Sequence, residues 1–284
     1  MSESTRPTPQ TRGRAQAPGP PLARQQRVVL ATLLGLAIVA WAVIIWQASR
    51  TGGMAMGDRT GGMAMGERST LDLTAGMSAG LFLVMWVVMM AAMMFPSAAP
   101  MVLMFARIHA GKRRRGQSFV PTWVFTGAYL ALWTAFGAIA YVLATAASAQ
   151  LRQSAWLAGN AACIGAVALV LAGVYQLTPL KRVCLRHCRS PLAFVMQHWR
   201  EGRAGSFLMG LRHGLYCLGC CWLLFVLLFP IGVMNLAAML LVTALVFAEK
   251  VLPAGERTAR VAAAALIGYG ALVLAVPAAL PLPA

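Results

Sequence analysis

The sequence predicts an all-α protein that crosses a membrane several times, and two observations carry this prediction. Of the 284 residues, 60% are hydrophobic and only 11% are charged, whereas a soluble domain carries about 25% charged residues. The apolar residues also fall into separate blocks of about twenty, the length of a helix that spans a bilayer. A single soluble core is therefore excluded, and we expect a polytopic bundle of transmembrane helices embedded in the lipid bilayer.

The apolar blocks predict about seven spans. The block at 28–48 lacks a clear cleavage site and is expected to remain as the first transmembrane helix. The tail before it, 1–27, is basic and rich in Pro and Gln, so we expect it to be disordered and cytoplasmic. The later spans are expected at 74–105, 120–147, 155–177, 206–230, 234–251 and 260–280. The expected divisions are the tail, the first helix, an outer loop (49–73), a metal-binding membrane domain (74–255) and the last helix with the C-terminus (256–284).

Basic residues predict the orientation, because cytoplasmic loops concentrate Lys and Arg. The sequence contains 24 Lys and Arg residues. With seven spans and a cytoplasmic N-terminus, most of them lie on the cytoplasmic side of the membrane. Those on the outer side are Arg50, Arg59, Arg68 and Arg152. The net charge of +17 then reflects membrane topology, and no nucleic-acid partner is expected. The basic loops are therefore expected to face the cytoplasm.

The outer loop contains a tandem repeat of nine residues, TGGMAMGDR followed by TGGMAMGER. Each copy carries a Met-x-Met pair, formed by Met54 and Met56 in the first and by Met63 and Met65 in the second. Thioether sulfur is a soft, neutral ligand that suits Cu(I). Metal capture and a duplicated flexible linker explain this repeat equally well.

The second span combines methionines with prolines. Most of its methionines, including Met93 and Met94, fall on about half of the helix circumference. Pro96 and Pro100 follow and are expected to interrupt the helix, because each proline removes a backbone donor. A thioether face beside such a break could pass a soft cation, although methionine is also an adaptable packing residue.

The fifth span places soft or borderline metal ligands on one helical face. Met209, His213, Cys217, Cys220 and Cys221 share an arc of about 120°. His213 and Cys221 lie about 12 Å apart along the helix axis, so the face offers either one site completed by another helix or two sites in series. Cysteine can be a small apolar filler, but ionisable groups inside a membrane usually have a function.

Two further candidates lie near the cytoplasmic side. Cys184, His187 and Cys188 would share one face if their segment, CLRHC, is helical, and thiols stay reduced in that compartment. Their spacing differs from the C-x-x-C of structural zinc sites. Glu249 ends the sixth span and is expected to meet water or pair with Lys250, or else to serve as a ligand or proton carrier.

Several sequence blocks resemble a bacterial family of uncharacterised integral membrane proteins with a predicted metal-binding role. These blocks are MWVVMMAAMMFPSAAPMV (85–102), YQLTPLKRVCLRHCRSPLAF (175–194), MGLRHGLYCLGCCWLL (209–224), VMNLAAM (233–239) and EK (249–250). The resemblance implies metal binding without identifying the ion. Carried over by position, it implies roles for Met93, Met94, Pro96, Pro100, Cys184, Cys188, His213, Cys217, Cys220, Cys221 and Glu249. The Met repeat lies outside the matching blocks.

Three functions are open from the sequence. The leading hypothesis is an inner-membrane protein that binds a soft transition metal, with Cu(I) favoured and zinc as the alternative. It would take part in metal transfer or cuproprotein assembly, with a soluble metallochaperone or a cuproprotein as its partner. The alternatives are a membrane thiol–disulfide redox enzyme that uses Cys217, Cys220 and Cys221, and a structural subunit of a membrane complex. The sequence lacks a phosphate-binding GxxxxGK[ST] motif, so ATP-driven pumping is not expected.

Overall fold

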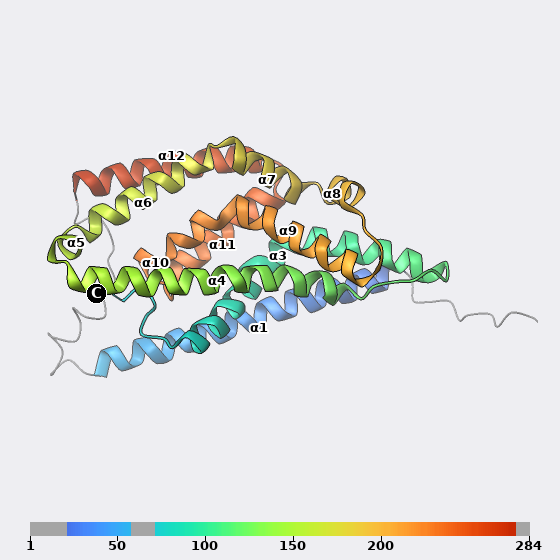
Figure 1. The fold of residues 1–284 in the computed structure, drawn as a ribbon, viewed down its shortest axis with the longest axis horizontal. Helices are drawn as coiled ribbons and strands as arrows, with labels where there is room; N and C mark the ends of the chain where they lie inside the picture. Colours follow the sequence, from blue (N-terminus) through green and yellow to red (C-terminus); the bar gives the residue numbers. More distant parts are fainter. Residues whose placement is uncertain (1–21, 58–71, 277–284) are drawn as a thin grey trace, which may run out of the picture.

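The computed structural model describes residues 22–57 and 72–276, and the regular elements in this part of the chain are all helices (Figure 1). The long helices are α1 (Leu22–Gly57), α3 (Ala79–Arg114), α4 (Thr122–Gln153), α9 (Gly202–Val226) and α12 (Gly255–Ala275). The shorter helices are α5 (Ala155–Gly159), α6 (Ala161–Gln176), α7 (Pro179–Arg189), α8 (Pro191–His198), α10 (Leu228–Ile231) and α11 (Leu236–Val251). The predicted all-α fold class is confirmed.

Several helices have the length and composition of membrane spans. Among the described residues, five qualify: Arg24–Ser49, Ala79–Arg114, Thr122–Gln153, Gly202–Ile231 and Gly255–Ala275. Together α6 and α7 make a sixth candidate, although they are bent by 62° where they meet. The helix at the predicted span 234–251, α11, has 16 residues and a length of about 24 Å, which is shorter than a bilayer core of about 30 Å. The count of seven spans therefore stays a prediction.

The second span differs from the broken helix that its prolines predict. A single helix, α3, continues through Pro96 and Pro100 to Arg114. A proline removes one backbone hydrogen bond, and a helix tolerates this loss where neighbouring protein encloses it. Met93 and Met94, just before the prolines, are completely buried. The expected interruption is wrong, and α3 presents a continuous methionine face to the core.

The helices pack in pairs around a common core. Figure 1 shows α6 and α12 side by side, while α1 packs along α3 and α4 packs along α9. The short helix α11 contacts α3, α7 and α9. The core combines aromatic residues such as Trp86, Trp133 and Phe225 with the methionines of α3 and the cysteines of α7 and α9. With Met239 of α11, this packing brings sulfur atoms from four helices into one buried region.

Glycines of α9 permit its close contact with α4. A β-carbon at Gly210 would overlap the carbonyl oxygen of Phe125 and lie 2.8 Å from the β-carbon of Ala128. A β-carbon at Gly214 would lie 2.8 Å from a methyl group of Leu132. The sequence predicts that these glycines admit a partner helix, as small residues do in membrane bundles. That prediction is confirmed, and the partner is α4.

The basic segments gather toward one end of the bundle. In Figure 1 the α3–α4 turn, α7 and α8 lie toward one end, and α5 and α10 toward the other. Lys112 at the end of α3 pairs with Glu201, which precedes α9. Arg189 at the end of α7 donates to the Pro253 carbonyl in the α11–α12 turn, at 3.0 Å. A single basic face is the arrangement that a cytoplasmic N-terminus requires.

Introduced cysteines test the orientation, because every native cysteine in the described residues except Cys163 is buried. Gln117→Cys lies in the α3–α4 turn, and Gln153→Cys lies at the far end of α4; both positions are exposed. We expect a membrane-impermeant maleimide to label Gln153→Cys in intact spheroplasts. It should reach Gln117→Cys only after the membrane is opened. The opposite pattern would place the N-terminus outside.

Gly210→Ala tests the contact between α4 and α9. The added methyl group meets a backbone carbonyl, so the helices must separate, and overpacking of this kind costs about 1–3 kcal/mol. We expect a lower melting temperature in detergent. The matched control is Gly127→Ala in α4, where an added β-carbon would meet nothing within 4 Å. Equal melting temperatures for the two variants would contradict the close contact.

Candidate metal site

The cysteines of α9 meet a lysine from another helix in the buried core. Lys250 Nζ, at the end of α11, lies 2.9 Å from Cys217 Sγ and 4.0 Å from Cys221 Sγ. It also lies 3.8 Å from Met94 Sδ of α3. Tyr129 of α4 places its hydroxyl group 3.1 Å from Cys217 Sγ. Four helices therefore meet around Lys250 and Cys217.

A fifth helix, α7, adds two cysteines to this region. The CLRHC segment is helical, as the sequence predicts, and Cys184 and Cys188 are both buried. The Cys188 side chain interacts with those of Cys217 and Cys220. Cys184 packs against Gly219 of α9, where a β-carbon would lie 2.7 Å from its sulfur. We define the thiol cluster as Cys188, Cys217, Cys220, Cys221 and Lys250.

The thiol cluster has soft donors, but its sulfur atoms are not arranged around a common point. The thiols of Cys220 and Cys221 donate to the backbone carbonyl oxygen of Cys217, at 3.0 and 2.9 Å. All described cysteines are free. Within the described ranges, no three His, Cys, Asp or Glu side chains form a ready-made metal centre. Rotation of Cys220 or Cys221 about χ1, between staggered positions, would release a sulfur for coordination.

His213 lies in an aromatic cage and makes no hydrogen bond to the thiol cluster. Its ring stacks with Phe125 and Tyr129, at centroid distances of 5.8 and 5.6 Å, and meets the Phe194 ring at 5.7 Å. Neither ring nitrogen has a hydrogen-bond partner among the described residues. Met209 is buried one turn earlier, in the part of the core that includes Phe125 and Phe194. Two different environments therefore follow each other along one face of α9: the aromatic cage around His213 and the thiol cluster.

Glu249 is engaged by α7 rather than by the thiol cluster. Its Oε2 accepts a hydrogen bond from Lys181 Nζ at 2.7 Å, and the two side chains are 2% and 1% exposed. Adjacent residues on a helix do not share a face, so Lys250 turns to the cysteines while Glu249 turns to α7. The expected pairing of Glu249 with Lys250 is wrong. A ligand or proton role for Glu249 stays a prediction.

Sequence reasoning missed two residues that contact Cys217. Lys250 is an ionisable side chain at the end of an apolar helix, and such side chains usually have a function. The sequence nevertheless predicted only that Lys250 pairs with Glu249. Tyr129 lies in an apolar block 88 residues before Cys217, and no local pattern distinguishes it. Both residues enter the site through packing between helices.

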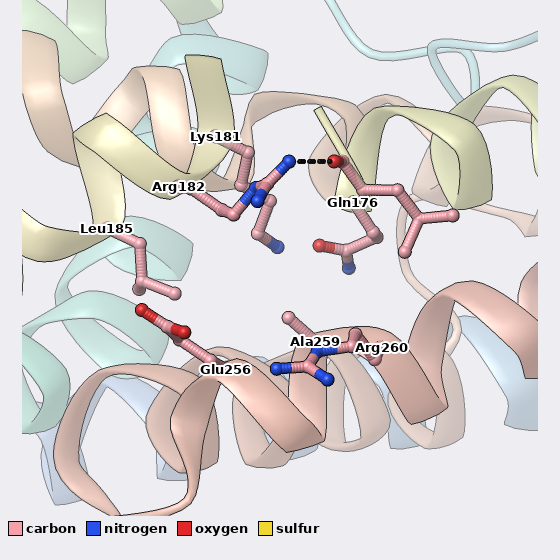
Figure 2. Close-up of a pocket in the computed structure, with 8 residues that line it drawn as sticks. Gln176, Lys181, Arg182, Leu185, Glu256, Ala259 and Arg260 are labelled. Carbon is pink, nitrogen blue, oxygen red and sulfur yellow. Dashed lines mark hydrogen bonds between the residues drawn. The ribbon is translucent and has the colours of Figure 1, made fainter. Parts of the chain in front are cut away.

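A polar cavity of about 420 Å³ lies beside the Lys181–Glu249 pair, between α6, α7 and α12. Figure 2 shows Gln176, Lys181, Arg182, Glu256 and Arg260 around it. Its lining contains three basic residues and no Cys, His or Met. A cationic lining without sulfur or imidazole is unsuited to a soft metal ion. The thiol cluster is therefore the better candidate metal site.

Among the methionine candidates of α3 and the outer loop, the structure describes the side chains of Met93 and Met94, which lie in the same core cluster as the cysteines. Met93 is buried in the core next to Met94. Met54 and Met56 belong to the last turn of α1, and their side chains are outside the described part of the structure. Met63 and Met65 lie outside the described residues altogether. Metal capture by the Met repeat stays a prediction.

Helices of membrane-span length around a buried group of cysteines define a membrane-type helical protein with a central thiol cluster. The chain belongs to the PpoB2 family of copper chaperones, whose family model matches residues 83–273. The match includes every residue of the thiol cluster and leaves out α1 and the Met repeat. No curated protein and no solved structure matches the chain. The resemblance to a metal-binding family is confirmed, and the family description adds copper.

Glu249→Gln tests whether the Lys181–Glu249 pair is structural. Removing one partner of a buried ion pair leaves an uncompensated charge and costs about 3–5 kcal/mol. We expect a large drop in melting temperature with unchanged copper stoichiometry in the protein that remains folded. The matched control, Glu256→Gln, removes the exposed contact with Arg186 at 3.8 Å, and exposed pairs contribute about 0–1 kcal/mol. Equal losses in the two variants would contradict the structural role.

Proposed function

We propose that this protein is a copper chaperone of the bacterial inner membrane, with seven spans and a cytoplasmic N-terminus. It holds Cu(I) at the thiol cluster and passes the ion to a cuproprotein. The family assignment supports copper as the metal. Thiolate and thioether sulfur are soft ligands and favour Cu(I) over harder ions. The observation that carries the proposal is the Lys250 ammonium group, 2.9 Å from Cys217 Sγ.

A buried lysine among thiols favours negative charge on sulfur. A charged group in a protein interior is costly unless it is paired. The ion pairs found among the described residues do not include Lys250, whereas three sulfur atoms lie within 4.0 Å of its Nζ. A Cys217 thiolate beside the Lys250 ammonium group balances this charge, and the thiolate is the form that binds metal.

Lys250 also matches the charge of a Cu(I) complex. Two thiolates around one Cu(I) leave a single negative charge, which the ammonium group neutralises in a region where uncompensated charge is costly. Zn²⁺ between the same two thiolates would form a neutral complex, which would leave the Lys250 ammonium group uncompensated. The thiol cluster should therefore prefer a monovalent soft ion to a divalent one.

Met94 connects the thiol cluster to the methionine face of α3. Its Sδ lies 3.8 Å from Lys250 Nζ, so an ion that replaced the contact between Lys250 and Cys217 would have a thioether nearby. Thioethers are neutral and bind Cu(I) more weakly than thiolates do, so an ion can exchange between the two kinds of ligand. We assign the methionine face, and beyond it the Met repeat, to the route by which copper passes to or from the outer side.

Replacing three cysteines tests the proposal directly. We expect the detergent-purified wild-type protein to bind stoichiometric Cu(I) in competition with a chromophoric chelator. Cys217→Ser, Cys220→Ser and Cys221→Ser together should weaken binding about a hundredfold or more, which is about 2.8 kcal/mol. The matched control is Cys163→Ser, because Cys163 is the one described cysteine that is not buried; it should bind copper as the wild type does.

The same preparations separate the proposed function from its alternatives. A thiol–disulfide enzyme would keep its activity in the presence of a copper chelator and would cycle a disulfide between cluster cysteines. If the protein were a structural subunit, its Cys217→Ser variant would function as the wild type does. Wild-type protein without copper, and with no more affinity for Cu(I) than a peptide containing only methionine ligands, would overturn the chaperone proposal.

A further inference from the structure

Two histidines form a pair on the surface, next to the thiol cluster. His187 in the last turn of α7 and His198 at the end of α8 have ring centroids 6.3 Å apart. The His187 ring stacks flat on Tyr216 of α9, with centroids 4.1 Å apart and planes at 1°. The His198 ring lies 6.1 Å from the same tyrosine ring. Tyr216 directly precedes Cys217 and His187 directly precedes Cys188, so both chain segments lead into the thiol cluster.

Backbone contacts determine which nitrogen of each imidazole ring is available. Nδ1 of His187 lies 2.9 Å from the carbonyl oxygen of Val183, and Nδ1 of His198 lies 3.1 Å from that of Phe194. A carbonyl oxygen only accepts, so each Nδ1 carries a hydrogen and each neutral ring keeps its lone pair on Nε2. An Nδ1–H held by a carbonyl, with Nε2 free, is the usual arrangement of a metal-binding histidine.

The spacing of the rings suits one ion with two ligands. A metal–nitrogen bond of about 2 Å, with about 1.1 Å from the nitrogen to the ring centre, separates two ring centres by about 6.2 Å in a linear complex. A tetrahedral angle would bring them to about 5 Å. With both Nε2 atoms turned to the ion, the observed centroid distance of 6.3 Å allows the linear arrangement that Cu(I) and Ag(I) adopt.

The neighbouring arginines of α7 are directed away from the two rings. Arg186 approaches Glu256 of α12 at 3.8 Å, and Arg189 donates to the Pro253 carbonyl oxygen at 3.0 Å. His187 instead turns to α9, where it stacks on Tyr216. Both histidines are half-buried, so their rings are held by packing while solvent still reaches them.

We propose that His187 and His198 form an entry site that binds Cu(I) and loads the thiol cluster; this inference rests on the proposed function. Cys188 connects the two sites, because it follows His187 and interacts with Cys217 and Cys220. Copper moves by ligand exchange without a change of oxidation state. Each bond from copper to Nε2 breaks as a bond to sulfur forms, and the proton of a coordinating thiol passes to water. The transfer is favourable because Cu(I) prefers thiolate to imidazole.

Nitrogen-15 NMR of labelled histidines tests binding in the full-length protein, which contains only His109, His187, His198 and His213. The probe is Ag(I), a diamagnetic substitute for Cu(I), added to the wild type and to the variant with all three α9 cysteines replaced by serine. We expect the Nε2 signals of His187 and His198 to shift together in both proteins. No shift of this pair, or a shift confined to His213, would overturn the entry site.

Loading kinetics test the transfer step. Copper is offered as a Cu(I)–chelator complex to the wild type, to His187→Ala/His198→Ala and to the matched surface control Gln197→Ala. We expect loading of the double variant to slow about tenfold, with the same final stoichiometry, while the control loads at the wild-type rate. Equal rates for all three proteins would overturn the inference and leave the proposed function intact. A wild type that takes up no Cu(I) would instead refute the proposed function itself.

Discussion

The contact between the Lys250 ammonium group and the Cys217 sulfur is the interaction on which the arrangement of the core depends. It places a cation from α11 among the thiols of α9 and beside a methionine of α3. A charge at this depth requires compensation, so these helices must keep their relative positions. The adjacent residue, Glu249, joins α11 to α7 through Lys181. The end of α11 is therefore held on two sides by buried charges.

This arrangement explains how a metal-handling protein can be stable without a ready-made coordination sphere. Two of the thiols of α9 bond to the backbone of their own helix, and Lys250 supplies the positive charge that balances a thiolate. Copper binding at the proposed site would then require small rotations of the cysteine side chains rather than movement of helices. Weak resting contacts of this kind suit a protein that must release its metal as well as bind it.

Sequence periodicity predicted much of the site and failed at identifiable points. The helical CLRHC segment, the buried face of α9 and the close approach at Gly210 follow from local spacing, and the structure has all three. The predicted break at Pro96 did not occur, because α3 stays helical from Ala79 to Arg114 with both prolines inside it. The pairing of Glu249 failed because its partner, Lys181, lies 68 residues earlier in the chain.

The sequence by itself determined that this chain forms apolar helices with basic turns, and that cysteines share one face of a helix. Hydrophobicity and the helical period are local properties, so they can be read along the chain. Only the tertiary structure decided that Lys250 and Tyr129 meet Cys217, and that His187 lies beside His198. These contacts depend on which helices pack together and in which register, and neighbouring residues in the chain do not encode either choice.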